Sequence, residues 1–306
     1  MLTFGGIIRI PFNQISVEAI SIGGLYTCIQ IPQLKLIFDI GLCPSSAIGQ
    51  EHVFLTHTHI DHMAGVLRHC STRELMNMSP PTYYMDPQYI EAFSDMMESA
   101  RRLNHATMPC TIQPVSPKES THIKGKYSIR SFRSIHRIPC IGYALIESRK
   151  KLRAELKNSD PKALQSLRNQ GIEITETIDT PIFCYPGDTC IDVMQREEIA
   201  RRSQILFIEL TFLDDRVSPE SARKHGHIHI NDIINNEDLF ADNQTIVFMH
   251  FSSRYKPEQI REILQEKLPD SLKSKCHFIP NTNILGSSSE PVKLNQIAVM
   301  PAEVGQ

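Results

Sequence analysis

Short apolar runs separated by turn-forming residues dominate the hydrophobic pattern of this chain. Runs this short, bounded by glycine, proline or polar residues, are typical of buried strands rather than of helices. Several of them end directly at an acidic residue or a histidine. The pattern predicts strands at residues 20–22, 25–31, 36–40, 51–56, 129–132, 141–146, 182–185, 205–210 and 245–249.

Two longer stretches predict helices. The first runs from Asp86-Pro87 to about Asn104, because aspartate suits a helix cap and proline is favoured at the first helical position. The second covers residues 148–168, where leucines recur at helical spacing, with an interruption at Asp160-Pro161. Strands interleaved with helices indicate an α/β fold in which helices are layered on sheets.

Size and composition fit one large folded domain, or two. The chain has 306 residues and 41% of them are hydrophobic, so it can bury a sizeable core. Its net charge of −2 means that any nucleic-acid contact has to come from a local basic patch. Eight cysteines without a Cys-x-x-Cys pair, and no secretory signal, favour a reducing, cytoplasmic setting. No apolar run approaches the roughly 20 residues that cross a bilayer, so no membrane partner is expected.

The densest candidate chemistry is the segment His57-Thr-His-Ile-Asp-His62, which places three imidazoles and a carboxylate in six positions. It follows the predicted strand at 51–56, so the cluster falls where a strand ends. Imidazole and carboxylate are ligand types of zinc and similar divalent ions. A histidine-rich surface loop is the alternative. Four ligand-type side chains directly after an apolar strand favour a metal site.

Other histidines and acidic residues lie in loops or at predicted strand ends, from which they could reach a common site. Taken singly, an ordinary turn or a strand-end histidine explains each of them better. They are His136, with His122 as a nearby alternative, Asp188 in a Pro-Gly-Asp-Thr turn, Glu209, His227 with His229, and His250.

The order of these motifs resembles that of the metallo-β-lactamase superfamily and, more narrowly, of the ribonuclease Z family in its short, plant-like form. The resemblance extends from about residue 50 to 255. Its first motif is general to the superfamily, whereas the Glu209, Gly-His and His250 motifs are more particular to the ribonuclease. The stretches that carry it are residues 56–65, His136-Arg-Ile-Pro-Cys-Ile-Gly-Tyr143, residues 171–178, Gly187-Asp-Thr189, Glu209-Leu-Thr-Phe-Leu-Asp-Asp215, Gly226-His-Ile-His229 and His250-Phe-Ser-Ser-Arg-Tyr255.

The resemblance implies an αββα sandwich that holds two Zn²⁺ ions per chain, or Mn²⁺ or Fe²⁺ in their place. The sequence departs from the family pattern in two places. Ile228-His229 stand where the family has Ser-Thr, and residues 42–50 replace a longer family stretch. The implied ligands are His57, His59 and His136 for one ion, Asp61, His62 and His250 for the other, and Asp188 as the bridge between them.

The chemistry that this family performs is hydrolysis of a phosphodiester. A zinc pair lowers the pKa of bound water from 15.7 to about 7 and clamps the phosphoryl oxygens. Asp61 is expected to deprotonate the attacking water as general base. The non-ligand pair His227 and Glu209 is expected to stabilise or protonate the leaving 3′-oxygen, with Glu209 raising the pKa of the imidazole. Candidate phosphate contacts near the site are Ser252, Ser253 and Arg254.

The basic segment occupies the place where family members insert an arm that grips tRNA. Seven basic residues stand against two acidic ones over 148–168, and charge alone fits a solvated helix as well as phosphate contact. The resemblance therefore implies a short basic arm, residues 148–180, protruding from a hydrolase domain at 1–285. Residues 286–306 are expected to form a flexible tail. The candidate tRNA contacts of the arm are Lys150, Lys151 and Arg153.

The expected activity is a zinc-dependent endoribonuclease that removes the 3′ trailer of precursor tRNA, leaves a 3′-hydroxyl, and works as a homodimer. Two alternatives stay open. A hydrolase of a small phosphodiester, lactone or thioester would need neither the arm nor the Glu209–His227 pair. A catalytically idle RNA-binding scaffold is disfavoured, because all seven metal positions are filled.

Overall fold

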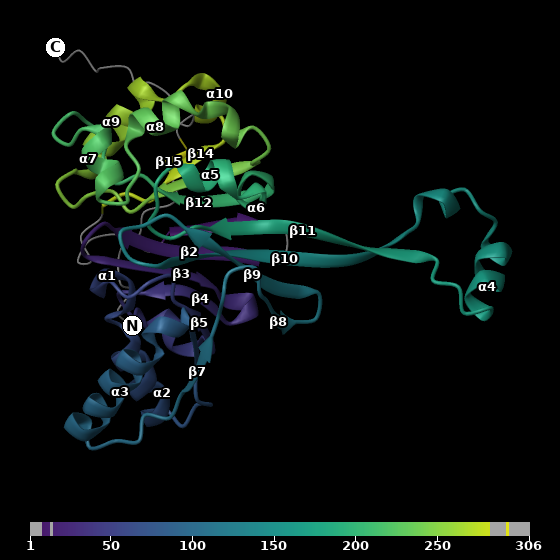
Figure 1. Cartoon of the computed structure of the whole chain (residues 1–306), viewed down its shortest axis with the longest axis horizontal. Helices are drawn as coiled ribbons and strands as arrows, with labels where there is room; N and C mark the ends of the chain where they lie inside the picture. Colours follow the sequence, from purple (N-terminus) through teal and green to yellow (C-terminus); the bar gives the residue numbers. More distant parts are fainter. Residues whose placement is uncertain (1–7, 13–14, 282–291, 294–306) are drawn as a thin grey trace, which may run out of the picture.

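The structure is a computed structural model that describes residues 8–12, 15–281 and 292–293. Two β-sheets pack face to face, and helices cover the outer face of each sheet (Figure 1). This order of layers is the αββα sandwich that the sequence predicted, so the fold class is confirmed. Apart from Val292 and Lys293, the predicted tail at 286–306 lies outside the described residues.

The first sheet has seven strands within the described residues, and they lie side by side in chain order. Pairing is antiparallel from β1 to β4 and parallel from β4 to β7. The strands are β1 (Ile8–Phe12), β2 (Ile15–Ile22), β3 (Tyr26–Ile31), β4 (Leu36–Ile40), β5 (His52–Phe54), β6 (Thr82–Met85) and β7 (Thr111–Pro114).

The second sheet repeats this plan with eight strands in the described part of the chain. Strands β8 to β11 pair antiparallel, β11 to β14 parallel, and β15 antiparallel to β14. The strands are β8 (Ser120–Lys124), β9 (Tyr127–Ser134), β10 (Cys140–Leu152), β11 (Thr175–Tyr185), β12 (Ile205–Glu209), β13 (Thr245–Met249), β14 (Cys276–Phe278) and β15 (Val292–Lys293).

Helices α1 to α3 accompany the first sheet, α5 to α10 the second, and α4 lies at the far end of a long hairpin (Figure 1). None of the described helices is long and apolar enough to span a membrane. The helices are α1 (Ile60–Met63), α2 (Val66–Leu75), α3 (Ile90–Asn104), α4 (Pro161–Asn169), α5 (Asp192–Arg196), α6 (Glu198–Arg202), α7 (Pro219–Lys224), α8 (Ile230–Asn235), α9 (Pro257–Lys267) and α10 (Asp270–Lys273).

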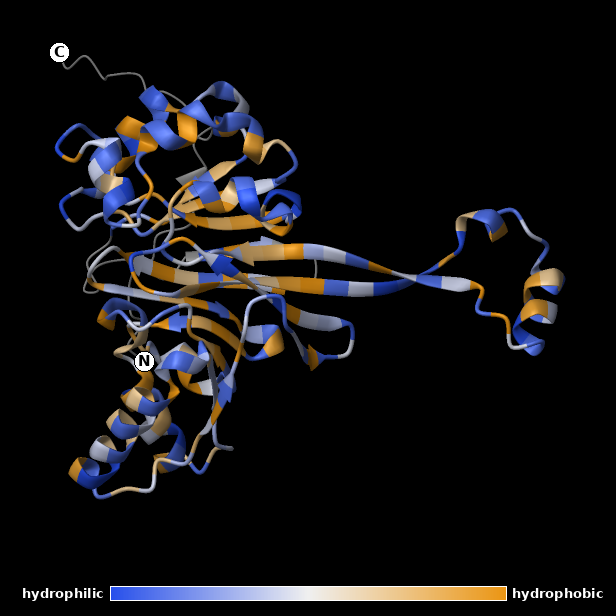
Figure 2. Ribbon diagram, viewed as in Figure 1, coloured by the Kyte–Doolittle hydropathy of each residue, from blue (hydrophilic) through white to orange (hydrophobic). Residues whose placement is uncertain are grey.

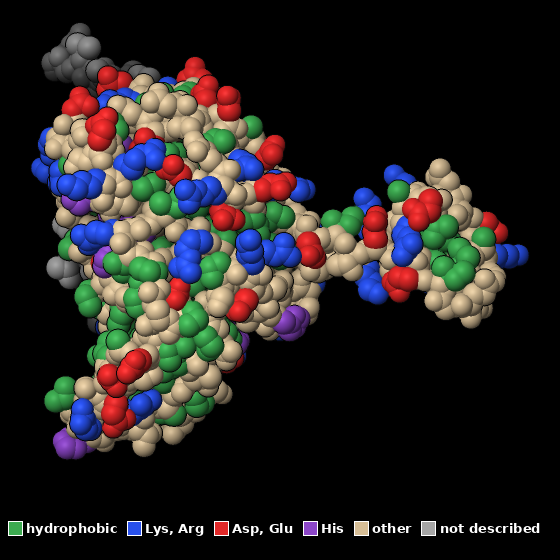
Figure 3. Space-filling view, in the orientation of Figure 1, with side chains coloured by type: hydrophobic (Ala, Val, Ile, Leu, Met, Phe, Trp, Pro, Cys, Tyr) green, Lys and Arg blue, Asp and Glu red, His purple; other side chains and the backbone are tan. Residues whose placement is uncertain are grey.

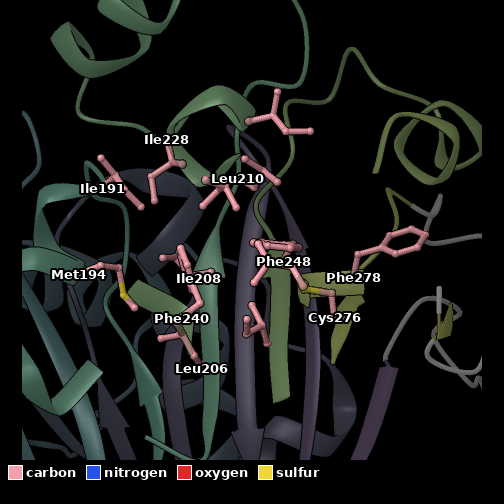
Figure 4. Packing of buried hydrophobic residues seen from close by; sticks show 14 of the residues in the cluster. Ile191, Met194, Leu206, Ile208, Leu210, Ile228, Phe240, Phe248, Cys276 and Phe278 are labelled. Carbon is pink, nitrogen blue, oxygen red and sulfur yellow. The ribbon is translucent and has the colours of Figure 1, made fainter. Parts of the chain in front are cut away.

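Three layers of apolar side chains hold the sandwich together. Central strands such as β4, β12 and β13 are apolar along their length because each lies between two of these layers (Figure 2). In the middle layer, the rings of Phe38 and Phe183 stack across the two sheets with centroids 5.2 Å apart. In one outer layer, Leu206 and Ile208 of β12 lie beside Phe248 of β13 (Figure 4). Removal of this surface from water is the main stabilising contribution to the fold.

The basic segment differs from its predicted helical form. Residues 149–151 belong to strand β10, which pairs with β11 in a hairpin that projects from the body of the protein (Figure 1). The helical prediction was wrong for these residues because the returning strand supplies backbone partners as far as Leu152. Asp160 and Pro161 begin helix α4 instead of interrupting one: the Asp160 carboxylate accepts the Lys162 amide as a cap.

Asp86 acts as the predicted cap, but a short 3₁₀ turn, Pro87–Tyr89, precedes the regular helix α3. The Asp86 carboxylate accepts a hydrogen bond from the Gln88 amide at 3.2 Å. The helix then ends at Asn104, as predicted.

Candidate metal centre and catalytic pair

The carboxyl ends of the parallel strands in both sheets meet at one edge of the sandwich, and the candidate residues lie there. This is the edge at which ligands bind in α/β sheets generally. The first motif follows β5 and continues into α1. Asp188 follows β11, Glu209 ends β12 and His250 follows β13. Segments far apart in sequence are thus brought to one place by strand pairing within each sheet and by the packing of the two sheets.

The first group of ligand-type side chains contains His57, His59, His136 and Asp188, whose donor atoms lie within 4.8 Å of one another. His59 Nδ1 lies 3.0 Å from His57 Nε2 and 3.3 Å from His136 Nε2. Asp188 Oδ2 lies 3.8 Å from His57 Nε2. The three nitrogens and the carboxylate oxygen converge on one point.

The second group contains Asp61, His62 and His250. The Nε2 atoms of His62 and His250 are 3.3 Å apart, and Asp61 Oδ2 lies 3.6 and 3.5 Å from them. Asp188 Oδ1 lies 3.4 Å from each of these nitrogens. The two oxygens of Asp188 therefore face the two groups, which is the geometry of a bridge.

This donor set fits a pair of divalent cations. Two zinc–nitrogen bonds of 2.0–2.1 Å at a tetrahedral angle hold their nitrogens about 3.4 Å apart, close to the separations found here. Asp188 Oδ1 is buried and has no hydrogen-bond partner, although a buried carboxylate oxygen ordinarily needs one. Burial lowers the pKa of His62, but the carboxylates of Asp188 and Asp39 raise it well above its usual value. The site thus favours positive charge.

Each buried imidazole uses its other ring nitrogen to bind a fixed partner, as metal-ligating histidines do. The Thr56 hydroxyl gives its proton to Asp39, so it accepts the proton of His57 Nδ1 and leaves Nε2 free to bind a metal. The same logic holds for the other rings. The partner contacts are His57 Nδ1 to Thr56 Oγ1 (2.9 Å), His136 Nδ1 to the Gly226 carbonyl (2.9 Å), His62 Nδ1 to Asp39 Oδ2 (2.7 Å) and His250 Nδ1 to Thr211 Oγ1 (3.1 Å).

Asp39 is a central residue that the sequence analysis included only within the predicted strand at residues 36–40. Its carboxylate is buried and accepts hydrogen bonds from the Thr56 amide at 2.7 Å, the Tyr185 hydroxyl at 2.9 Å and His62 Nδ1. A signal was present, because a carboxylate inside the apolar run Leu36–Ile40 has to be buried, and a buried charge needs partners. Asp39 also has a positive φ of 55°, which directs the chain into the turn below the metal site.

His227 and Glu209 form a hydrogen-bonded pair next to both ligand groups. His227 Nδ1 lies 2.8 Å from Glu209 Oε1 and 4.0 Å from Asp188 Oδ2. Burial lowers the pKa of His227, but the charge and hydrogen bond of Glu209 outweigh it and raise the pKa to about 9. Glu209 is itself held by the amides of Thr189 (2.9 Å) and Thr211 (3.2 Å).

The neighbouring His229 has a structural role that separates it from His227. It is buried, its Nδ1 accepts the Asn231 amide at 3.2 Å, and it caps α8 together with Asp232. Gly226, just before the pair, has φ +79°, and a Cβ there would lie 2.7 Å from the Arg137 backbone. Glycine at 226 therefore lets the loop approach His136 closely.

Asp61 lies at the accessible side of the centre. The Gly24 amide donates to its Oδ2 at 2.9 Å. Burial raises the pKa of Asp61, but contacts with His250 and His62 lower it to about 2. The carboxylate is therefore ionised at neutral pH. It can accept a proton from a water molecule that a bound cation makes more acidic.

The candidate substrate contacts lie outside the centre. Ser252, Ser253 and Arg254 follow His250 at the surface, where Arg254 Nε donates to Ser252 Oγ at 3.0 Å. The Arg254 guanidinium also lies over the Phe212 ring, and that ring contacts His227.

Lys150, Lys151 and Arg153 lie on the projecting hairpin (Figure 1). Lys150 pairs with Glu173 at 3.3 Å. The alternative histidine, His122, lies on β8 and belongs to neither ligand group.

Comparisons with known proteins agree with this geometry. Residues 44–251 match the family model of the beta-lactamase superfamily domain. The chain is 36% identical over 255 residues to the chloroplastic tRNase Z TRZ2 of Arabidopsis thaliana, covering 83% of this chain and 72% of that protein. It is 35% identical over 261 residues to tRNase Z TRZ1 of the same plant, covering 85% and 92%.

Among solved structures, the metallo-beta-lactamase fold protein YhfI from Bacillus subtilis superposes with a TM-score of 0.57 at 13% identity, covering 85% of this chain and 93% of that one. At that identity the likeness concerns the fold alone. The sequence relatives carry the closer relationship. The chain therefore belongs to the ribonuclease Z family of the metallo-β-lactamase superfamily and is a metal-dependent hydrolase.

Proposed function

We propose that this chain is a zinc-dependent endoribonuclease that cuts the 3′ trailer from precursor tRNA and leaves a 3′-hydroxyl. The observation that carries the proposal is the Glu209–His227 pair. His227 also lies near enough to Asp188 and His250 to form a third ligand-type group, but its Nδ1, 4.0 Å from Asp188 Oδ2, is bound to Glu209. An alkoxide such as the ribose 3′-oxygen is a poor leaving group, so its departure gains most from a positioned acid. The names of the curated relatives, tRNase Z, support tRNA as the substrate class.

Seven side chains would hold two Zn²⁺ ions: His57, His59, His136, Asp61, His62, His250 and the bridging Asp188. When bound, the ions would supply positive charge at the scissile phosphate and acidify the attacking water. Asp61 accepts the proton of that water, because its ionised carboxylate is fixed by Gly24 on the accessible side. Mn²⁺ or Fe²⁺ could occupy the same donor set.

His227 protonates or stabilises the leaving oxygen. Glu209 occupies Nδ1, so the opposite nitrogen, Nε2, is the one available to substrate. Because Glu209 keeps the imidazole charged up to about pH 9, the acid form is present at neutral pH. Arg254, Ser252 and Ser253 would bind a phosphate next to this imidazole. Arg254 lies over the Phe212 ring, and that ring contacts His227.

The hairpin of residues 148–180 would grip tRNA at a distance from the centre. Lys151 and Arg153 form no ion pair within the described residues and are exposed, so their charges are free for phosphate. We extend the proposal to a homodimer, in which the arm of one subunit holds the tRNA cut by the other. None of the eight cysteines forms a disulfide, which suits a reducing compartment such as the cytoplasm.

The test compares two substrates on the zinc-loaded protein: a precursor tRNA with a 3′ trailer, and bis-p-nitrophenyl phosphate. We expect one cut after the acceptor stem, and a product whose 3′ end is oxidised by periodate, as a free 2′,3′-diol is. A 3′-phosphate product would contradict the mechanism.

The remaining alternative is a small-molecule hydrolase of the same fold. Turnover of the small ester without any cleavage of precursor tRNA would favour it. The Glu209–His227 pair is the specific observation against it.

A further inference from the structure

One cysteine of this chain differs from the others in its surroundings. All eight cysteines lie in the described residues; seven are buried, and Cys110 alone is partly exposed. Cys110 precedes β7 and lies on the outer side of the first sheet, remote from the strand-end edge that carries the metal centre. The proposed function makes no use of it.

Cys110 lies between a second cysteine and an arginine. The Cys70 thiol, on α2, donates to the carbonyl oxygen of Pro109 at 3.6 Å, and it also lies within hydrogen-bonding reach of the Cys110 sulfur. On the other side, Arg101 Nη2 lies 3.6 Å from the Cys110 sulfur. The two thiols are therefore neighbours, and a cation lies beside Cys110.

The surrounding segment is held firmly in place, so this contact is a built feature. Arg101 Nε donates to the Thr107 carbonyl at 2.9 Å and Nη2 to the Met108 carbonyl at 3.3 Å. From α2, the Glu74 carboxylate accepts the Met108 amide at 2.8 Å. Ser71, which follows Cys70, and Met108, two residues before Cys110, line part of a hollow of about 320 Å³.

The pair has the electrostatics of a reactive thiol and a partner thiol. The hydrogen bond from Cys70 is the main cause that lowers the pKa of Cys110 to about 7; partial burial opposes it, and the Arg101 charge adds to it. The same contact, together with burial, raises the pKa of Cys70 far above its usual range. Thiolate character and exposure together determine which cysteine is oxidised first.

We propose that Cys110 and Cys70 form a peroxide-reactive thiol pair that closes into a disulfide between α2 and the segment before β7. The Cys110 thiolate attacks a hydroperoxide, so that an S–O bond forms, the O–O bond breaks and, for hydrogen peroxide, one water leaves after protonation. The Cys70 sulfur then attacks the sulfenic acid: the S–S bond forms, the S–O bond breaks, and a second water leaves with the Cys70 proton. Two thiols lose two electrons, and one peroxide becomes two waters.

The test exposes the folded, zinc-loaded protein to hydrogen peroxide in equimolar amount, followed by alkylation with N-ethylmaleimide and peptide mass mapping. We expect a Cys70–Cys110 disulfide as the first oxidation product, reversed by dithiothreitol. In Cys70→Ser, dimedone should trap a sulfenic acid on Cys110. In Cys110→Ser, Cys70 should stay reduced under the same exposure. Cys276, a buried thiol elsewhere, is the control and should stay reduced in every variant.

Two neighbouring arginines provide a matched pair of variants. Arg101→Gln should slow the alkylation of Cys110 roughly tenfold, because it removes the adjacent cation. Arg102→Gln, whose side chain contacts Ser99 instead, should leave the rate unchanged. Oxidation of Cys70 in Cys110→Ser, a persistent sulfenic acid in the unmutated protein, or first oxidation at another cysteine would each overturn the proposal.

Discussion

The metal centre and the arm use charge in opposite ways. At the centre, charged and polar side chains are buried, and nearly every one has a fixed partner: Asp39 alone binds the amide and hydroxyl of Thr56, His62 and Tyr185. On the arm, the charges are exposed, and acidic and basic side chains alternate over its surface (Figure 3). The difference teaches that buried hydrogen bonds fix the geometry of the centre, whereas the proposed grip on tRNA would rest on exposed, salt-sensitive charge.

The arm is also less basic than its outgoing strand alone suggests. Residues 148–180 contain seven basic and five acidic residues, because the returning strand contributes Glu173, Glu176 and Asp179. Lys150 pairs with Glu173, and Arg130 from the body pairs with Asp179. The free positive charge is therefore concentrated on a few side chains, among them Lys151 and Arg153.

The largest expected effect is at the residue that joins the two ligand groups. Asp188→Ala should lose both metals and slow cleavage of either substrate roughly a thousandfold or more, since the several kcal/mol that divalent cations contribute correspond to that factor. Metal analysis per chain checks it. Two zincs retained in the variant would contradict the bridging role and, with it, the idea that the centre acts as one unit.

Removing the imidazole that is not a ligand should separate chemistry from metal binding. His227→Ala should keep both metals while cleavage slows roughly a hundredfold to ten-thousandfold, the range for a lost acid catalyst. The matched control is His225→Ala, an exposed histidine two residues away, which should cleave at the normal rate. Equal losses in the two variants would argue for a local folding defect.

A buried partner of a ligand should matter less than the ligand itself. Asp39→Asn weakens the hydrogen bond that fixes His62, so zinc affinity should fall roughly 10- to 100-fold. Competition with a zinc-binding dye measures this affinity. If the zinc affinity stays unchanged, the buried hydrogen bonds around Asp39 support only the fold. They would then not position the metal ligands, and the contrast between the centre and the arm would weaken.

Glu209→Gln tests the charge of His227 through pH. The protonated imidazole is fully present below its pKa, so activity that needs it should fall as pH rises through about 9. Without the Glu209 charge, burial dominates and lowers that pKa, so the fall should begin at lower pH. Rate profiles of both forms, with His227→Ala as the control that lacks this fall, decide whether His227 is the acid.

The smallest effect is expected on the arm. Replacing Lys150, Lys151 and Arg153 together with glutamine should weaken tRNA binding about tenfold at physiological salt and flatten its salt dependence. Hydrolysis of bis-p-nitrophenyl phosphate should not change. Arg202→Gln, which removes an exposed cation from a surface pair with Glu198, is the control. An equal loss on both substrates would mean that the arm does not act in binding.

The sequence predicted the centre better than the arm for a physical reason. Imidazoles and carboxylates are common metal ligands, so the cluster His57 to His62 could be identified from residue type and position. Asp188 and His250 were assigned as ligands only through the resemblance to the family. The partners of these ligands are harder to identify: Thr211 has an ordinary residue type, and the only signal for Asp39 was a carboxylate inside an apolar run.

On the arm, residues 149–151 were predicted as helix because leucine spacing and basic charge carry no information about a strand that returns only at Thr175. Tertiary pairing overrode the local pattern there. Thr245–Met249, by contrast, is buried on both faces and matches its predicted bounds. A short, continuous apolar run is typical of a strand that is covered on both faces.

Zinc titration of chelator-treated protein tests the central claim most directly. Cleavage of precursor tRNA and bound zinc would be measured in the same samples as zinc is added. Activity should be absent without metal and reach its plateau at two zincs per chain. A plateau at one zinc per chain, or cleavage that persists without metal, would contradict the account.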